Sequence, residues 1–167
     1  MEPLNLAEPL DALRRFNQLN HDLCDALEAL ADTAERGGDA TALRAPAAEI
    51  HRHFGGHAVA HHKDEEEDLF PLLARQSLKL ADRVHQANLG HERLAAAWQD
   101  LGPILLDPNA MVADPTAFAA KAHTYARMQR EHSRFEEEAL FDMAEHILGS
   151  EDLARISKAM KKRRGVV

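Results

Sequence analysis

A ten-residue phrase that occurs twice constrains this chain more than any other feature. His61–Phe70 and His132–Phe141 both read His-x3-Glu-Glu-Glu-x-Leu-Phe. On an α-helix, residues four positions apart lie on one face, so each copy directs an imidazole and a carboxylate to the same spot. Two such spots that face each other inside a helical bundle form a metal site. The repeat therefore predicts a helical fold with metal ligands in its interior.

A longer repeat surrounds the phrase. His21 is followed by an acidic residue and precedes His61 by 40 positions. His91 is likewise followed by an acidic residue and precedes His132 by 41 positions. The chain thus reads as two copies of one helical hairpin, each with a single His followed by a His-x3-Glu pair. We expect four imidazoles and two carboxylates to converge between the helices, and burying so many titratable groups without a cation would be costly.

Apolar spacing and helix breakers divide the chain into five helical stretches. Gly37-Gly38 ends the first stretch, Gly55-Gly56 and Pro71 are weak points of the second, and Asp114-Pro115 is typical of a helix start. No stretch alternates with the period of two that a strand requires. The sequence predicts an all-α fold, an antiparallel up-down four-helix bundle with a short C-terminal fifth helix. The expected helices are residues 10–36, 41–76, 77–106, 115–148 and 151–162, in a single domain over residues 1–167. Asp107-Pro108-Asn109 is interpreted as a loop after the third helix.

Composition excludes several classes of protein. The 28 acidic and 20 basic residues give a net charge of −8, which argues against a nucleic-acid partner. The basic cluster Lys158–Arg164 is interpreted as a solvated last helical turn. No apolar run approaches the roughly 18 residues of a membrane span. One cysteine, Cys24, excludes an intramolecular disulfide, and Met1–Leu13 lacks the features of a secretory signal, so we expect a cytoplasmic protein.

The type of metal site is narrowed by the spacing of the ligands. His-x3-Glu occurs three times, because His62–Glu66 also fits the pattern and competes with His61–Glu65. No Glu has a His three residues later, so the Glu-x-x-His motif of ferritin-like di-iron proteins is absent. Imidazole with carboxylate suits iron, manganese or zinc, and two carboxylates suit a pair of ions. The remaining glutamates of the two phrases are interpreted as solvated faces: Glu66, Glu67, Glu137 and Glu138.

The two phrases resemble the signatures of the hemerythrin-like, HHE-type family. His61–Pro71 reads His-His-x-x-Glu-Glu-x-x-Leu-Phe-Pro, and the resemblance extends over roughly Leu10 to Arg164. It implies two iron ions joined by an oxo or hydroxo group. By this resemblance His21 and His61 bind one ion, His91 and His132 bind the other, and the carboxylates of Glu65 and Glu136 bridge the two. Glu65 and Glu136 precede their Leu-Phe pairs by the same interval, which favours His61–Glu65 over His62–Glu66 and places His62 at the rim.

The sequence departs from the oxygen-carrying hemerythrins, which have a fifth His in a His-x3-His pair and a His-x4-Asp motif. Here Ala87 and Ala95 flank His91, so the set resembles the four-His, two-Glu bacterial type. Some members of that type are implicated in repair of damaged iron centres. Those members usually carry a cysteine-bearing domain before the bundle, whereas 20 residues precede His21 here, so the resemblance to them is incomplete. His57 and Tyr125 are further candidates for the pocket.

The resemblance implies a non-haem di-iron protein that binds O2, NO or peroxide, for sensing, iron or oxygen handling, or a stress response. One alternative is a peroxidase- or oxidase-like di-iron enzyme. Another is a structural bundle whose site holds zinc or nothing. The sequence offers no general acid–base pair and no substrate pocket, so it defines no enzymatic reaction. It predicts no membrane or nucleic-acid partner and does not identify a protein partner.

Overall fold

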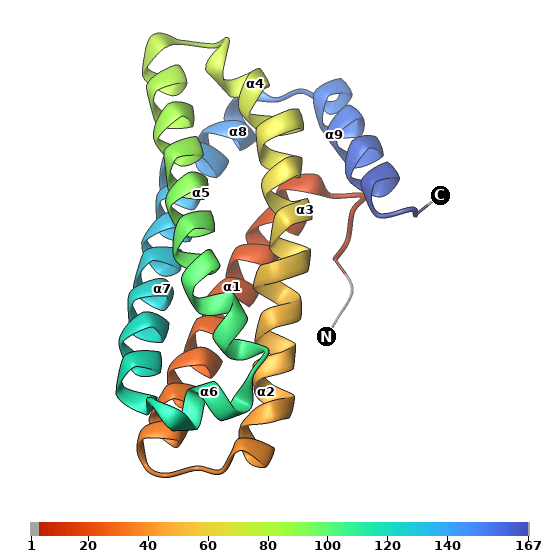
Figure 1. Ribbon diagram of the computed structural model, residues 1–167. Coiled ribbons are helices and arrows are strands. Elements are labelled where there is room, and N and C mark those ends of the chain that lie inside the picture. The colour runs from red at the N-terminus through yellow and green to blue at the C-terminus, as the bar shows by residue number, and fades with distance from the viewer. Residues whose placement is uncertain (1–3, 167) are drawn as a thin grey trace. The chain divides into compact units, whose positions relative to one another are not determined.

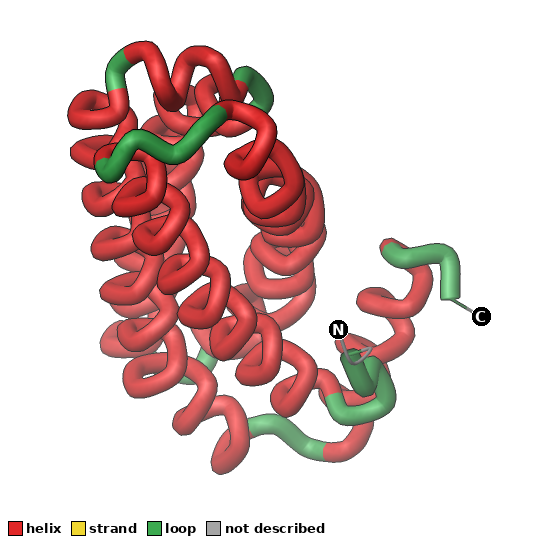
Figure 2. Tube along the Cα trace, turned by 90° about the horizontal axis from the view of Figure 1, so that it is seen from below, coloured by secondary structure: helices red, strands yellow, loops and turns green. Residues whose placement is uncertain are grey.

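The structure is a computed structural model that describes residues 4–166, so the remaining positions of the predicted 1–167 domain lie outside the described residues. Within 4–166 all regular structure is helical (Figures 1 and 2), which confirms the all-α prediction. The α-helices are α1 (Pro9–Glu35), α2 (Ala40–Arg52), α3 (Ala58–Lys63), α4 (Phe70–Ala74), α5 (Leu78–Leu105), α6 (Pro108–Ala113), α7 (Pro115–Glu136), α8 (Asp142–Ile147) and α9 (Ser150–Arg163). The π-helical turns are η1 (His53–His57), η2 (Asp64–Leu69) and η3 (Glu137–Phe141).

Several of these elements follow one another without a break. The segment from α2 to α4 is continuous over residues 40–74, and α7, η3 and α8 are continuous over 115–147. All five predicted helical stretches are present, with ends within two residues of the predicted ones. Helix α6 was not predicted, because Asp107-Pro108-Asn109 was interpreted as a loop. Asp107 instead caps it, accepting a hydrogen bond from the Asn109 N–H at 3.1 Å, with proline at the first helical position.

Local chemistry explains the sharp turn after α1. Gly37 adopts a φ of 85°, a conformation that glycine tolerates at a helix C-terminus. The Gly38 N–H then donates to the Thr33 carbonyl at 2.9 Å, which satisfies one of the last free carbonyls of the helix. Asp39 caps the next helix by accepting from the Ala42 N–H at 2.9 Å. Three consecutive residues thus end one helix and begin the next.

Contacts divide the chain into two compact units. Unit 1 comprises the residues up to Leu19, Val59–His91 and the chain from His132; unit 2 comprises Asn20–Ala58 and Glu92–Glu131. Every boundary falls inside a helix, namely α1, α3, α5 or α7, so each of the four long segments contributes to both units. Both copies of the repeated phrase belong to unit 1.

The core of unit 1 contains the Leu-Phe pairs of both phrases. Leu69, Phe70, Leu140 and Phe141 have at most 1% of their surface exposed and belong to one hydrophobic cluster. Helix α9 adds to this cluster through two buried residues, Ile156 and Met160. Burial of each Leu-Phe pair fixes the rotation of the helix that carries it, because apolar side chains lose stability when they turn to water. The pairs thereby set which face of each phrase points inward.

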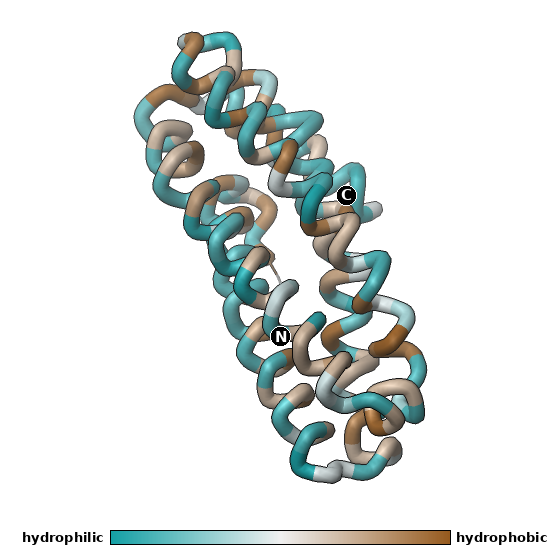
Figure 3. Tube along the Cα trace, turned by 60° about the vertical axis from the view of Figure 1, so that its left-hand side comes forward, coloured by the Kyte–Doolittle hydropathy of each residue, from teal (hydrophilic) through white to brown (hydrophobic). Residues whose placement is uncertain are grey.

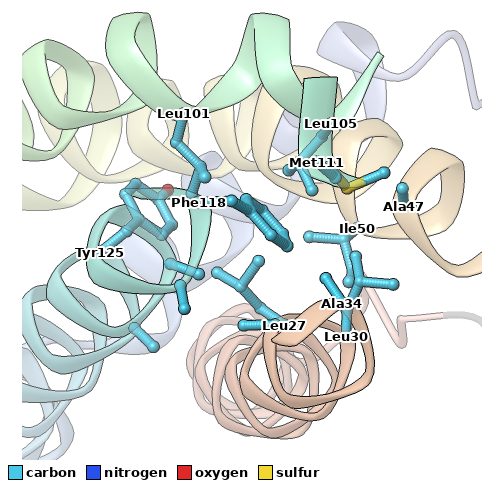
Figure 4. Packing of buried hydrophobic residues seen from close by; sticks show 14 of the residues in the cluster. Leu27, Leu30, Ala34, Ala47, Ile50, Leu101, Leu105, Met111, Phe118 and Tyr125 are labelled. Atoms are coloured by element: carbon cyan, nitrogen blue, oxygen red, sulfur yellow. The ribbon is translucent and has the colours of Figure 1, made fainter. Parts of the chain in front are cut away.

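Unit 2 has a hydrophobic core of its own, shown in Figure 4. Helices α1, α2, α5, α6 and α7 all contribute to it. Its labelled members are Leu27, Leu30, Ala34, Ala47, Ile50, Leu101, Leu105, Met111, Phe118 and Tyr125. Apolar residues recur along each helix at intervals that keep them on one side, and Figure 3 shows hydrophobic and hydrophilic residues mixed along the helices. In the described part of the chain, no helix has the length and apolar character needed to cross a membrane.

The cap of α7 yields a prediction about stability. Asp114 accepts a hydrogen bond from the Ala117 N–H at 3.0 Å and begins the helix that carries His132 and Glu136, as the sequence predicted. We expect Asp114→Ala to lower the free energy of unfolding by about 1 kcal/mol, because it leaves an N-terminal N–H without its partner.

Urea unfolding measures this change. Asp114→Asn is the matched control, since asparagine caps helices about as well as aspartate. Equal losses for the two variants would show that the side-chain cap does not stabilise α7.

Candidate metal centre

Both copies of the repeated phrase contain a π-helical turn close to the glutamate. In the first copy the Phe70 N–H donates to the Glu65 carbonyl, five residues back, and in the second the Asp142 N–H donates to the Glu137 carbonyl. Turns of this kind widen an α-helix locally and are frequent at functional sites. The internal repeat is therefore one of backbone geometry as well as of sequence.

The carboxylate of Glu65 lies between two imidazoles. Its Oε1 is 3.1 Å from His61 Nε2 and its Oε2 is 3.3 Å from His91 Nε2. The side chain is completely buried. Phe16 stacks on the His61 ring with a centroid distance of 4.1 Å, which holds that ring in place. The two oxygens of Glu65 therefore face different imidazoles.

Glu136 is the second buried carboxylate. Its Oε1 is 2.8 Å from His132 Nε2 and 3.1 Å from His91 Nε2. Its Oε2 accepts a hydrogen bond from Asn17 Nδ2 at 3.3 Å, and the same amide donates to the Ser133 carbonyl. Sequence reasoning did not identify Asn17, a residue of α1 that carries no metal-ligand signal of its own.

Among the described residues, two groups of potential ligand atoms are close enough to hold a cation. His61, Glu65 and Glu136 form one group, and within each group the ligand atoms lie within 4.8 Å of one another. The second group is His62, His91 and His132. The structure thus brings together five of the six predicted ligands and adds His62. His21, the sixth, is half-buried on α1 and belongs to neither group, so its metal role stays a prediction.

The geometry of these contacts favours a cation over a set of hydrogen bonds. His61 Nε2, His132 Nε2 and both oxygens of Glu65 have no well-aligned hydrogen bond within the described chain, although nitrogen and oxygen lie 2.8–3.3 Å apart. A buried polar atom without a partner costs about 1–3 kcal/mol. Cations held by the two groups of ligand atoms would give these four atoms partners. The donor set, imidazole with carboxylate, suits iron, manganese or zinc.

Electrostatics keep both carboxylates ionised. Burial raises the pKa of Glu136, but the imidazoles of His132 and His91 outweigh it and the pKa lies well below its usual value. For Glu65, burial and the nearby Glu136 raise the pKa, and His61 and His91 lower it to a net value below normal. Two ionised carboxylates in the interior attract positive charge. Burial lowers the pKa of His91, yet the adjacent carboxylates of Glu136 and Glu65 raise it to about 11.

Two residues outside the predicted ligand set contact His91: His62, which was expected at the rim, and Glu66, which was expected on a solvated face. The His62 ring stacks on it at a centroid distance of 3.9 Å, and Glu66 Oε1 accepts from His91 Nδ1 at 2.6 Å. The Glu66 bond orients the ring so that Nε2 faces Glu65 and Glu136, the arrangement by which carboxylates orient metal-binding histidines. Burial, with a smaller effect of His91, lowers the pKa of His62 to about 3, which leaves the ring neutral. The sequence signal for these two contacts is that each predicted ligand has an identical neighbour, His62 beside His61 and Glu66 beside Glu65.

Gly90 makes room for His132. A Cβ at this position would lie 2.3 Å from His132 Nδ1, closer than real Cβ atoms approach. Any side chain here would displace the His132 imidazole. The glycine beside His91 therefore serves the opposite histidine, a role that sequence spacing does not reveal.

The remaining candidates lie in unit 2. His57 is exposed in η1, and Tyr125 is buried against the rings of Phe54 and Trp98. Burial raises the pKa of the Cys24 thiol to about 12, so this cysteine behaves as a small hydrophobic residue. None of these three belongs to either ligand group of the described residues.

Comparison with known proteins agrees with the site. The chain is 28% identical over 169 residues to an uncharacterized protein of Haemophilus influenzae, with 99% of this chain and 97% of the relative covered. Residues 8–144 match the family described as Hemerythrin HHE cation binding domain, and this range includes both ligand groups. The match covers most of the chain, and the protein therefore belongs to the hemerythrin HHE cation-binding family.

Proposed function

We propose that this protein binds two iron ions and uses them to bind a small ligand, O2, NO or peroxide. The observation that carries the proposal is the Glu65 carboxylate, whose two oxygens face His61 on one side and His91 on the other. A carboxylate placed in this way serves two ions better than one. Membership of a cation-binding family supports the same conclusion. We also propose that the four long helical segments form an antiparallel bundle and that the protein is cytoplasmic.

Each half of the centre has its own ligands. His61 would hold one ion, with His21 as its predicted second imidazole, and His91 and His132 would hold the other. Glu65 and Glu136 would bridge them. His62 lies within reach of the second half as an additional imidazole. Bound iron would supply coordination positions for a diatomic ligand and a centre that changes oxidation state.

The side chains around His91 bear on where a ligand would bind. Ala87, one turn before His91, is buried and small, whereas Ala95, one turn after it, is exposed. The His62 ring covers one face of His91. We propose sensing, iron or oxygen handling, or a stress response as the role of this ligand binding.

Zinc binding is a second candidate, favoured by one observation. His62, His91 and His132 place three imidazole groups close together, and three histidines are a common zinc ligand set. A zinc ion held there would serve structure or Lewis-acid chemistry. The nearby pair of buried carboxylates favours two ions over this single one.

Metal analysis tests the proposal directly. Protein produced with sufficient iron should contain about two iron atoms per chain, because the Glu65 carboxylate has a different imidazole beside each of its oxygens. Azide or NO should change its visible spectrum. One equivalent of zinc in protein never exposed to chelator, or an iron-loaded protein whose spectrum ignores both ligands, would contradict the proposal.

The four glutamates of the two phrases provide a second test. Glu65→Ala and Glu136→Ala should each remove most of the iron, since a bridging carboxylate touches both ions. Glu66→Ala should weaken iron affinity about 10- to 100-fold, because Glu66 acts through the His91 ring. Glu137→Ala, the matched control next to Glu136, should retain the metal.

Iron content and retention against a chelator, measured for all four variants, give the ranking. A loss at Glu66 that exceeds the loss at Glu65 would show that the proposed register is wrong by one residue.

A further inference from the structure

The last turn of α9 contacts the helix that carries Glu65. Arg163 pairs through Nη1 with Asp64 Oδ1 and with Asp68 Oδ2 at 2.9 Å, and through Nη2 with Glu67 Oε2 at 2.8 Å. Arg164 pairs through Nη2 with Asp64 Oδ2 at 2.6 Å and through Nη1 with Asp64 Oδ1 at 3.0 Å. The basic cluster Lys158–Arg164, interpreted from the sequence as a solvated turn, therefore includes two arginines that bind acidic residues of the first phrase. We call Arg163 and Arg164 the arginine clamp.

Asp64 is the centre of the clamp. Its side chain is completely buried, and each of its oxygens accepts from a guanidinium. Two parallel bonds from one arginine to one carboxylate fix the direction as well as the distance of the pair. A buried carboxylate without a cation is strongly destabilising. Asp64 therefore keeps its position only while the arginines hold it.

Asp64 is the residue next to Glu65, and both lie in the π-helical turn η2. The turn places Asp64 toward α9 and Glu65 toward the imidazoles, as their contacts show. π-Helical turns are rare and persist where their surroundings hold them. By binding Asp64, Arg163 and Arg164 thus also fix the backbone from which the Glu65 side chain extends.

Within residues 4–166, no arginine pair of this kind contacts the second phrase. The position of Asp64 corresponds there to Phe135, which packs against the hydrophobic cluster of unit 1. Glu136 is instead held through Asn17. The chain therefore positions its two buried carboxylates by different means, ion pairing for Glu65 and packing with an amide for Glu136. The family match ends at residue 144, before α9 begins, so the clamp lies outside the matched domain.

We propose that Arg163 and Arg164 are positioning residues for the metal centre: through Asp64 they hold η2 in the form that directs Glu65 between the two halves of the site. This role rests on the metal centre proposed above. It makes the C-terminal helix a part of the centre, although α9 contributes no ligand. The consequence is an asymmetry, because loss of the clamp disturbs Glu65 and leaves Glu136 in place.

The test compares Arg163→Gln/Arg164→Gln with Arg163→Lys/Arg164→Lys and with Lys162→Gln, a control on the same helical turn. In the full-length, iron-loaded protein, we expect the glutamine pair to lose iron to a chelator about tenfold faster or more. The lysine pair should recover part of the retention, since it restores charge without the fork, and Lys162→Gln should match the unmodified protein.

Hydrogen exchange of the iron-free protein gives a second, independent readout. The amides of η2 should exchange faster in the glutamine pair, while those of η3 stay as slow as before. The single variant Arg164→Gln gives the same comparison if the double variant does not fold. Unchanged exchange in η2, or iron retention in the glutamine pair equal to that of the unmodified protein, would overturn the proposal. An unmodified protein without iron would overturn the proposed function instead, while the exchange data would still test the clamp.

Discussion

The structure depends on two ionised carboxylates buried beside imidazoles. Glu65 and Glu136 are almost entirely inaccessible, and the pKa of each lies below its usual value despite burial. Removing such charges from water is expensive unless positive charge meets them. His91, with its raised pKa, meets them in part, but the buried atoms of His61, His132 and Glu65 keep no aligned hydrogen bond in the described chain. The protein therefore keeps at its centre an arrangement that a cation stabilises.

The surrounding fold is built to hold this arrangement. The Leu-Phe pairs after each glutamate are fully buried and set the rotation of their helices. The π-helical turns beside Glu65 and Glu136 shift the register within those helices, and Gly90 leaves the space that the His132 ring occupies. Ion pairs from α9 then fix Asp64. Apolar burial, backbone geometry and ion pairing thus act on the same few residues.

Much of the fold could be predicted from the sequence because helix signals are local. Apolar spacing, glycine pairs and the Asp114 cap located all five helical stretches, and the repeat located five residues that the structure brings together. Features that depend on tertiary contacts escaped prediction. His62 was expected at the rim and Glu66 on a solvated face, yet both contact the His91 ring, because α5 brings that ring against them. Arg163 and Arg164 carry no sign of their distant partner Asp64, and α6 was interpreted as a loop.

In the proposed centre, the carboxylates of Glu65 and Glu136 bridge two iron ions. Mössbauer spectroscopy of protein loaded with 57Fe, recorded in small and large applied magnetic fields, tests whether the two ions are bridged. Two oxidised iron ions that share bridging carboxylates should couple magnetically into a centre with no net spin. Two quadrupole doublets without magnetic splitting at low field are the predicted result. A magnetically split spectrum from isolated high-spin iron, in protein with full iron occupancy, would contradict the account.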